Sequence, residues 1–172
     1  LDALHSHPFL KTRFALKGGT ALNLFHFEVP RLSVDIDLNY IGSVDRDAML
    51  AEKPKVEQAV QAVCSRESLT VKRMPTDHAG GKWPLTYVGT KGNPGNLELD
   101  VNFMLRTPLW PCVTKDCHPV GSFRAAPVRV LYLHELTAGK LAALLARSAS
   151  RDVFDAHALL VTPGLDPVKL RL

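Results

Sequence analysis

Cysteine is scarce in this sequence, and long apolar runs are missing from it. Its 172 residues include three cysteines, and an odd number of them argues against the disulfide framework of a secreted protein. No apolar run approaches the ~20 residues that cross a bilayer, and no charged start followed by a hydrophobic segment marks a signal peptide. We therefore expect a cytoplasmic protein with no membrane partner.

Internal repeats and low-complexity segments are also missing, and the chain is 46% hydrophobic and 22% charged, as in ordinary globular proteins. These features exclude the disordered and collagen-like classes. The length predicts one domain or a small core with an appendage. Lys and Arg total 21 against 17 Asp and Glu, a net charge of +4 that permits an anionic partner. Because the chain begins with Leu1 rather than methionine, we expect further sequence before it.

Hydrophobic periodicity predicts the order helix, strand, helix, three strands and two helices. Alternation of apolar and polar residues predicts the first strand over 33–40. The other predicted elements are helices over 14–27, 45–67 and 133–146, a last helix with Ser150 as its N-cap, and strands over 69–74, 84–89 and 96–105. This order indicates an α+β fold with a core over 1–112, followed by a connector and a C-terminal helical segment over 113–172 that completes the active site.

Two aspartates on the first predicted strand are the strongest candidates for chemistry. Asp35 and Asp37 are two residues apart, so their side chains point the same way and can share a divalent cation such as Mg²⁺. A solvent-facing edge strand would carry the same pair. The neighbouring motifs therefore decide between the two interpretations.

A glycine pair precedes this strand. Gly18, Gly19 and Thr20 open the first predicted helix, and glycines let main-chain N–H groups approach a phosphate. Lys17 can add a charge-assisted hydrogen bond. Two adjacent glycines alone are more often a turn, and the spacing of a Walker A loop is absent. Glycines, a helix and a strand with paired aspartates are together far more specific.

A third carboxylate lies on the polar face of the strand predicted over 96–105. If that strand pairs with the first, Asp100 joins the aspartate pair, and Glu98 is an alternative on the same face. Two-metal nucleotidyl transfer uses such a cluster to activate the attacking oxygen and to stabilise the leaving group. A surface acid on a half-exposed strand is the competing explanation.

These motifs resemble those of a known enzyme superfamily. The segments KGGTALNLF, RLSVDIDL and LELDVNF resemble the nucleotidyltransferases of the DNA polymerase β superfamily, and GKLAALLARSASRDVFDAHALL is similar to a segment of AbiEii-type toxins of type IV toxin–antitoxin systems. The resemblance implies a polymerase β-like core, a mixed sheet with flanking helices, followed by C-terminal helices. Family members are usually longer at the C-terminus, so we expect a truncated or minimal version.

Carried over by position, the resemblance implies a role for each matching residue. Asp35 and Asp37 would bind metal, whereas the third carboxylate, Asp100, is not uniformly required among these toxins. Lys140 and Asp155 match the downstream functional residues of the family, with Asp152 as a nearby candidate. The residues implied to lie near the nucleotide phosphates are Lys17, Gly18, Gly19, Thr20 and Ser33.

The charges of the helical tail support this assignment. On an unbroken helix, one face would carry Lys140, Arg147, Arg151 and Asp155. A cationic edge opposite an acidic cluster suits triphosphate binding, with Arg151 giving bidentate contacts. The Ser-Ala-Ser segment at 148–150 interrupts the pattern. Asp155 could equally pair with Arg151, and Lys140 could simply face solvent.

The predicted function is transfer of a nucleoside monophosphate from an NTP, with Mg²⁺ or Mn²⁺, to an acceptor that the resemblance implies is the 3′ end of tRNA. Pyrophosphate is released, and a cognate antitoxin is the expected partner. Transfer to a protein, a nucleotide-binding regulator without turnover and a non-catalytic RNA-binding module stay open as alternatives. Between residues 101 and 151 there are seven Lys or Arg and two acids, which favours a polyanion beside the proposed catalytic strand.

Overall fold

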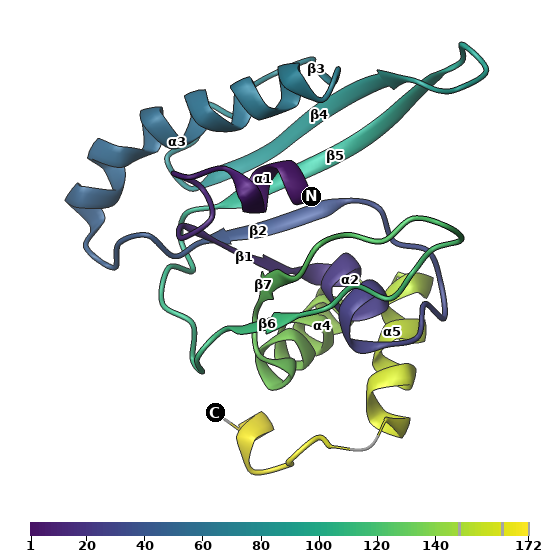
Figure 1. Cartoon of the computed structure of the whole chain (residues 1–172). Helices are drawn as coiled ribbons and strands as arrows, with labels where there is room; N and C mark the ends of the chain where they lie inside the picture. The colour runs from purple at the N-terminus through teal and green to yellow at the C-terminus, as the bar shows by residue number, and fades with distance from the viewer. Residues whose placement is uncertain (148, 163, 172) are drawn as a thin grey trace.

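The centre of the molecule is a mixed β-sheet. A computed structural model describes residues 1–147, 149–162 and 164–171, and its strands form one sheet in the order β3-β4-β5-β2-β1-β7-β6 (Figure 1). The strands in this part of the chain are β1 (Phe14–Lys17), β2 (Ile36–Tyr40), β3 (Thr70–Val71), β4 (Gly80–Val88), β5 (Pro94–Asn102), β6 (Val113–Lys115) and β7 (Val128–Val130). Strand β2 is antiparallel to β1 and parallel to β5.

Helices lie on both sides of this sheet (Figure 1). Those formed by the described residues are α1 (Asp2–Ser6), α2 (Gly18–Ala21), the π-helical turn η1 (Leu22–His26), α3 (Arg46–Arg66), α4 (Leu133–Arg147), α5 (Ser150–Val161) and the 3₁₀ turn η2 (Lys169–Arg171). The long helix α3 runs along β3, β4 and β5, whereas α4 and α5 gather beside α2 (Figure 1). None of these helices is long and apolar enough to cross a membrane.

Strands β1 and β2 separate an apolar face of the sheet from a polar one. In their register, Leu16 lies opposite Leu38 on a buried face, and the hydroxyl of Tyr40 on that face donates a hydrogen bond to α3. Neighbouring residues of a strand point to opposite faces. On the other face, Lys17 therefore lies opposite Asp37. The fold thus turns the second aspartate away from the core beneath α3.

Helix α3 forms although a proline lies in its interior. The carboxylate of Asp45 caps its start by accepting a hydrogen bond of 2.8 Å from a main-chain N–H of the first turn. Pro54 removes one N–H from the helix, at a cost of about 3 kcal/mol. Val56 and Val60 are fully buried on its inner face, and each such side chain contributes about 1.5–3 kcal/mol, which offsets the loss. The helix predicted over 45–67 is confirmed.

The segment predicted as one helix over 14–27 contains a strand before its helical turns. Strand β1 has four residues, too few to show a period, and it forms because β2 and β7 pair with it on either side. Strands β6 and β7 were not predicted. They lie in the segment after residue 112 and join the same sheet. The cap of α5 is Ala149 without a side-chain hydrogen bond, so Ser150 is its first residue rather than its N-cap. The predicted fold class, an α+β protein with a mixed sheet and flanking helices, is confirmed.

Candidate active site

A cavity of about 560 Å³ opens over the polar face of the sheet. Its walls come from the turn after β1, the loop before β2, strand β5 and helix α4. Thr20 and Asp155 are buried and contact residues of these walls. The other predicted site residues line the cavity itself: Lys17, Gly18, Gly19, Ser33, Asp35, Asp37, Asp100, Lys140 and Arg151.

Four charged residues form a row across neighbouring strands on this face. In register, Lys17 of β1 lies opposite Asp37 of β2, which in turn lies opposite Asp100 of β5. Asp100 lies opposite Lys82 of β4. Residues in register on neighbouring strands share a face, so two carboxylates lie side by side between two ammonium groups. The two acidic strands are thus neighbours, the condition under which Asp100 joins the aspartate pair, and Asp35 immediately precedes β2 at the same cavity.

Burial and like charge act together on the carboxyl of Asp37. Burial raises its pKa, and the ammonium of Lys17 opposes this rise. The negative charges of Asp100 and Asp35 raise the pKa further. A carboxylate in this position is stabilised by positive charge brought beside it. Asp35, Asp37 and Asp100, called the acidic row below, therefore favour a bound cation.

The chemistry of the acidic row fits Mg²⁺ held jointly with a substrate. In the part of the chain that the structure describes, no three Asp, Glu, His or Cys side chains enclose a position for a metal ion. Mg²⁺ is usually bound through one or two carboxylates and takes its other oxygen ligands from water and substrate phosphates. Asp35, Asp37 and Asp100 supply hard oxygen ligands at an open cavity. The residues present thus fit such an ion with a nucleotide, and they do not form a complete cage.

The glycine pair lets two segments approach each other closely. Gly18 has a φ of +73°, and a Cβ atom on it would lie 2.0 Å from Oδ2 of Asp37. A Cβ atom on Gly19 would lie 2.8 Å from Oγ of Ser33 and 3.0 Å from a guanidinium nitrogen of Arg31. The positive φ and the close contact with Asp37 require a glycine at position 18, whereas a larger residue at position 19 would displace the ends of the Ser33 and Arg31 side chains.

Thr20 holds the loop that carries the first aspartate. Its buried hydroxyl donates a hydrogen bond to the main-chain oxygen of Asp35 and lies 3.3 Å from Oγ of Ser33. These contacts fix the loop against α2. Direct contact of this hydroxyl with a phosphate stays a prediction.

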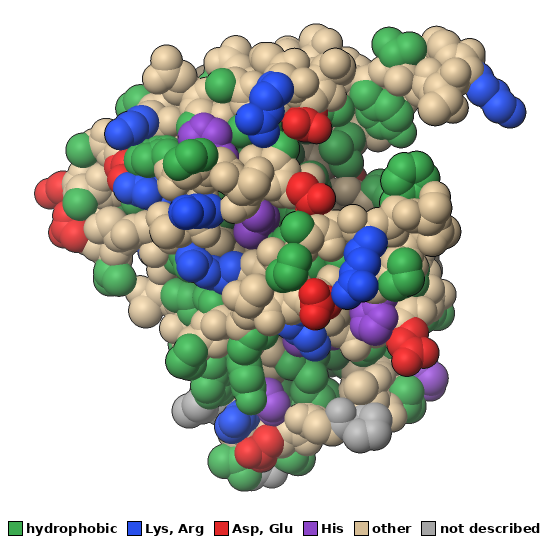
Figure 2. Space-filling model, in the orientation of Figure 1, with side chains coloured by type: hydrophobic (Ala, Val, Ile, Leu, Met, Phe, Trp, Pro, Cys, Tyr) green, Lys and Arg blue, Asp and Glu red, His purple; other side chains and the backbone are tan. Residues whose placement is uncertain are grey.

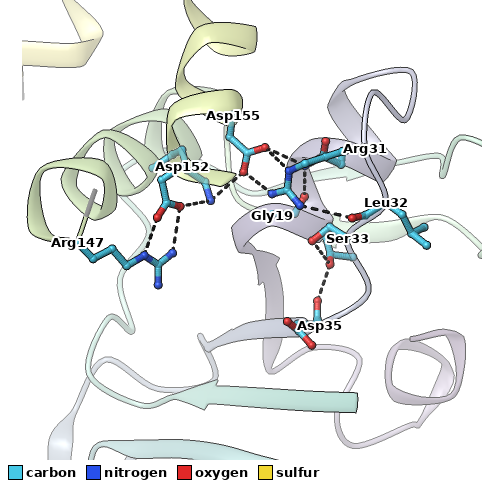
Figure 3. Close-up of polar contacts among 11 residues, drawn as sticks. Gly19, Arg31, Leu32, Ser33, Asp35, Arg147, Asp152 and Asp155 are labelled. Atoms are coloured by element: carbon cyan, nitrogen blue, oxygen red, sulfur yellow. Dashed lines mark hydrogen bonds and ion pairs between the residues drawn. The ribbon is translucent and has the colours of Figure 1, made fainter. Parts of the chain in front are cut away.

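Five charged side chains form a second cluster, called the basic wall below (Figure 3). The carboxylate of Asp155 accepts hydrogen bonds of 2.8 and 2.6 Å from Arg31, and it lies 3.0 Å from Nζ of Lys140. Asp152 lies 3.1 Å from the same ammonium. Asp152 also accepts hydrogen bonds of 2.6 and 3.0 Å from Arg147. Three cations and two anions thus tie the loop before β2 to both α4 and α5.

Both aspartates of the basic wall are fully buried and remain charged. The hydrogen bonds from Arg147, together with Lys140, lower the pKa of Asp152 to about 2 although burial opposes the shift. Burial would raise the pKa of Asp155, but hydrogen bonds from Arg31 and Lys140 outweigh it and lower that pKa. Carboxylates with these partners hold cationic side chains in place.

The charged residues of the tail meet in a different way from the one predicted. Helices α4 and α5 are separate, and Ser148 of the predicted interruption lies outside the described residues. Asp155 pairs with Arg31 and Lys140 rather than with Arg151. Lys140 is 8% exposed and so does not simply face solvent. Burial between two carboxylates holds its ammonium at the cavity.

Arg31 is the main site residue that sequence reasoning missed. It bonds to Asp155, which follows it by 124 positions, and no local pattern reports such a contact. One signal does exist, because Arg31 stands two residues before Ser33 in the same motif as the aspartate pair.

The positive charge of the chain is divided between the cavity and the outer surface. Among the basic residues between 101 and 151, Lys140, Arg147 and Arg151 line the cavity. On the face shown in Figure 2, Lys and Arg side chains are scattered rather than gathered into one patch, and the β4–β5 hairpin projects from the body. The local excess of positive charge therefore lies in part beside the acidic row.

Comparisons with known proteins agree with this geometry. Over residues 1–171 the sequence matches the protein family described as nucleotidyl transferase AbiEii toxin, type IV TA system. A search among curated proteins finds no match.

Solved structures share the fold. MenT4, a nucleotidyltransferase toxin from Mycobacterium tuberculosis, is 21% identical with a TM-score of 0.66, and the similarity covers 92% of this chain and 53% of that one. JHP933 from Helicobacter pylori is 18% identical with a TM-score of 0.57, and the similarity covers 92% of this chain and 60% of that one. This chain therefore spans little more than half the length of these two structures.

Proposed function

Since this chain belongs to the AbiEii family of nucleotidyltransferase toxins from type IV toxin–antitoxin systems, we propose that it transfers a nucleoside monophosphate from an NTP to an acceptor. The hydroxyl oxygen of the acceptor bonds to the α-phosphorus, and the bond from that phosphorus to the bridging oxygen of the β-phosphate breaks. Pyrophosphate leaves, and the hydroxyl proton passes to a carboxylate of the acidic row. One NTP and one acceptor thus give one nucleotidylated acceptor and pyrophosphate.

The observation that carries this proposal is the pairing of Asp37 with Asp100 in one cavity with Lys140. Phosphoryl and nucleotidyl transfer need charge stabilisation on both sides of the reacting phosphorus. The acidic row supplies ligands for Mg²⁺ or Mn²⁺, an ion that would neutralise phosphate charge and polarise the phosphorus. Lys17, Lys140 and Arg151 supply fixed positive charge at the same cavity.

Several residues act in the proposal by holding others. Asp155 and Asp152 hold Lys140 with its ammonium at 3.0 and 3.1 Å, so we assign them positioning roles. Thr20 holds the loop of Asp35 through its main-chain oxygen. Because α4 and α5 carry four of the five residues of the basic wall, the segment after residue 112 completes the proposed site.

We propose an RNA acceptor, in particular the 3′ end of tRNA, in the cytoplasm, with a cognate antitoxin as partner. Family membership supports the toxin role, and the basic excess between residues 101 and 151 supports a polyanionic acceptor. The Lys and Arg side chains among the cavity lining would attract the negatively charged backbone of an RNA.

The test is product analysis with each of the four NTPs, labelled at the α-phosphate. The full chain is incubated with Mg²⁺, total tRNA and, in parallel, a cytoplasmic protein extract. We expect label on tRNA with at least one NTP, removable by nuclease that attacks the 3′ end. Label on protein alone would replace the RNA acceptor by a protein acceptor. Absence of label from both would contradict nucleotidyl transfer.

A further inference from the structure

An amide without a partner lies beside the acidic row. Asn39 follows Asp37 by two residues on β2, so both side chains leave the same face of the strand, and both line the same cavity. Asn39 is 2% exposed, and its Oδ1 atom accepts no hydrogen bond from any described residue. Other described residues have such an atom, but among them Asn39 alone lines this cavity.

The neighbours of Asn39 in the sheet donate no hydrogen bond to its Oδ1 atom. Ala15 on β1 lies opposite it and has no polar side-chain atom. Asn102 on β5 lies opposite it on the other side, and its side chain accepts hydrogen bonds of 2.9 Å from the N–H groups of Met104 and Leu105 but donates none to Asn39. Buried polar groups are nearly always paired. A partner from outside the chain is therefore the natural complement of this amide.

Helix α4 leaves room at the cavity. Gly139 lines the cavity, and a Cβ atom on it would meet no other atom within 4 Å. A glycine inside a helix destabilises it relative to alanine, so this open space has a cost in stability. Leu131, Leu136 and Ala143 add apolar or small side chains to the lining. Apolar side chains beside a few polar groups are usual in a pocket for a small organic ring.

The charged residues of the cavity already account for the phosphates of a nucleotide. Asp37 and Asp100 attract cations, and Lys17 and Lys140 attract phosphate oxygens. Asn39 is neutral and offers both a donor and an acceptor. Its chemistry matches the neutral, hydrogen-bonding part of the substrate.

We propose that Asn39, with the space beside Gly139, forms a nucleoside subsite that sets which nucleotide the protein prefers. This inference rests on the proposed function, because it assumes that an NTP binds at the acidic row. The amide of Asn39 binds a neutral hydrogen-bonding group of the nucleoside. That group is an edge of the base or the 2′-hydroxyl of the sugar, and the two sources are separated by experiment.

Nucleotide binding by the full chain, measured without an acceptor, tests the inference. The four NTPs, their 2′-deoxy forms and inorganic tripolyphosphate compete with a fluorescent nucleotide in the presence of Mg²⁺. In Asn39→Ala we expect the Kd of the preferred NTP to rise about five- to tenfold, the value of one lost hydrogen bond. Tripolyphosphate should bind as before. Loss of preference among the bases identifies a base edge, and loss of preference for the ribose form identifies the 2′-hydroxyl.

Stability supplies a second readout. Because the amide has no partner in the protein, Asn39→Ala should keep or raise the Tm, unlike removal of a structural hydrogen bond. Asn96→Ala is the matched control, since Asn96 is an exposed asparagine on β5 outside the cavity, and it should change neither Kd nor preference. Gly139→Leu should raise the Kd of every NTP about tenfold by filling the space, again without effect on the binding of tripolyphosphate.

Three outcomes would overturn the inference. Unchanged nucleotide preference in Asn39→Ala would show that the amide does not contact the nucleoside. Equal weakening of all NTPs and of tripolyphosphate would assign Asn39 to the cation instead. If the wild-type chain bound no NTP, the proposed function would fail as well, whereas the first two outcomes leave that function intact.

Discussion

The acidic row and the cations of the basic wall line the same cavity, yet the charges of the two clusters are compensated in different ways. The two aspartates of the basic wall are fully buried and each accepts bonds from two cationic residues. In the acidic row, Asp37 and Asp100 are neighbours of like charge, and no described side chain donates a hydrogen bond to either carboxylate. The charges of the basic wall thus compensate one another, whereas the like charges of the acidic row favour a cation from outside.

This difference predicts opposite effects of substitution in the two regions. Removing a charge from the acidic row relieves repulsion but removes a ligand, so function should suffer more than stability. Removing a charge from the basic wall leaves buried cations without partners, so stability should suffer first.

Asp37→Asn should lower the rate of nucleotide transfer to tRNA about 10³-fold, because it removes a charged ligand for the cation at the reacting phosphate. The Tm should stay equal or rise, since repulsion from Asp100 disappears. Radiolabelled transfer assays and thermal unfolding measure the two quantities. Asp47→Asn is the control, because the side chain of Asp47 is 91% exposed. A stable Asp37→Asn protein with full activity would remove Asp37 from the site.

Asp155→Ala should lower the free energy of unfolding by about 3 kcal/mol, because it leaves Arg31 without its buried counterion and leaves Lys140 with Asp152 alone. Urea denaturation at pH 7 measures the loss. Asp116→Ala is the matched control, since the side chain of Asp116 is 72% exposed and its ion pair is long at 3.6 Å. A change below about 1 kcal/mol in Asp155→Ala would mean that the basic wall does not stabilise the fold.

Acid should affect the two regions with opposite sign. The pKa of Asp152 is lowered to about 2, so the stability it contributes is fully present above the pKa of an unfolded aspartate, ~3.9. That stability, on the order of 1–2 kcal/mol, is lost as the pH falls toward 2. The pKa of Asp37 is raised, so its contribution is present below ~3.9 and is lost as the pH rises through its folded value.

Thermal unfolding between pH 2 and pH 7 separates these two effects. In Asp152→Asn the Tm should fall less than in the wild type as the pH drops toward 2. In Asp37→Asn it should fall less than in the wild type as the pH rises toward 7. Wild-type and variant curves of the same shape would contradict the assignment of charge states in both regions.

Arg147→Ala and Arg151→Ala should differ in their effects on stability and on nucleotide binding, although the two residues are only four positions apart. Arg147 binds buried Asp152 but is half exposed itself, so its loss should cost about 1 kcal/mol of stability. Arg151 is exposed at the cavity, so its loss should leave stability unchanged and weaken nucleotide binding a few-fold, less at high salt. Urea denaturation and nucleotide competition distinguish the two, and equal effects of both variants would contradict the contrast.

Local patterns were enough to predict the acidic strand and the long helix. Side chains of a strand alternate, so Asp35 and Asp37 follow from the sequence between 33 and 40 alone. The short strands were missed because three or four residues show no period. Strand β1 exists through its pairing with β2 and β7, and both partners come from distant parts of the chain.

The candidate site divides in the same way. Its glycine pair, its aspartates and Lys140 were identified from motifs and from a family resemblance. Arg31 was missed, and a pairing of Asp155 with Arg151 on its own helix stayed open as an alternative, because the contact between Arg31 and Asp155 joins segments 124 positions apart. Such contacts form only when distant segments of the chain come together in the fold, so local periodicity in the sequence does not predict them.

By itself, the sequence determined where the aspartates, glycines and helical cations stand along the chain and which face of β2 carries the acids, because strand geometry is local. Only the tertiary structure decided that Asp37 lies beside Asp100, that two buried carboxylates hold Lys140 at the cavity, and that Asn39 is left there without a partner. The physical reason is that burial and pairing are properties of elements packed together, and the free energy of those contacts appears only when distant segments meet.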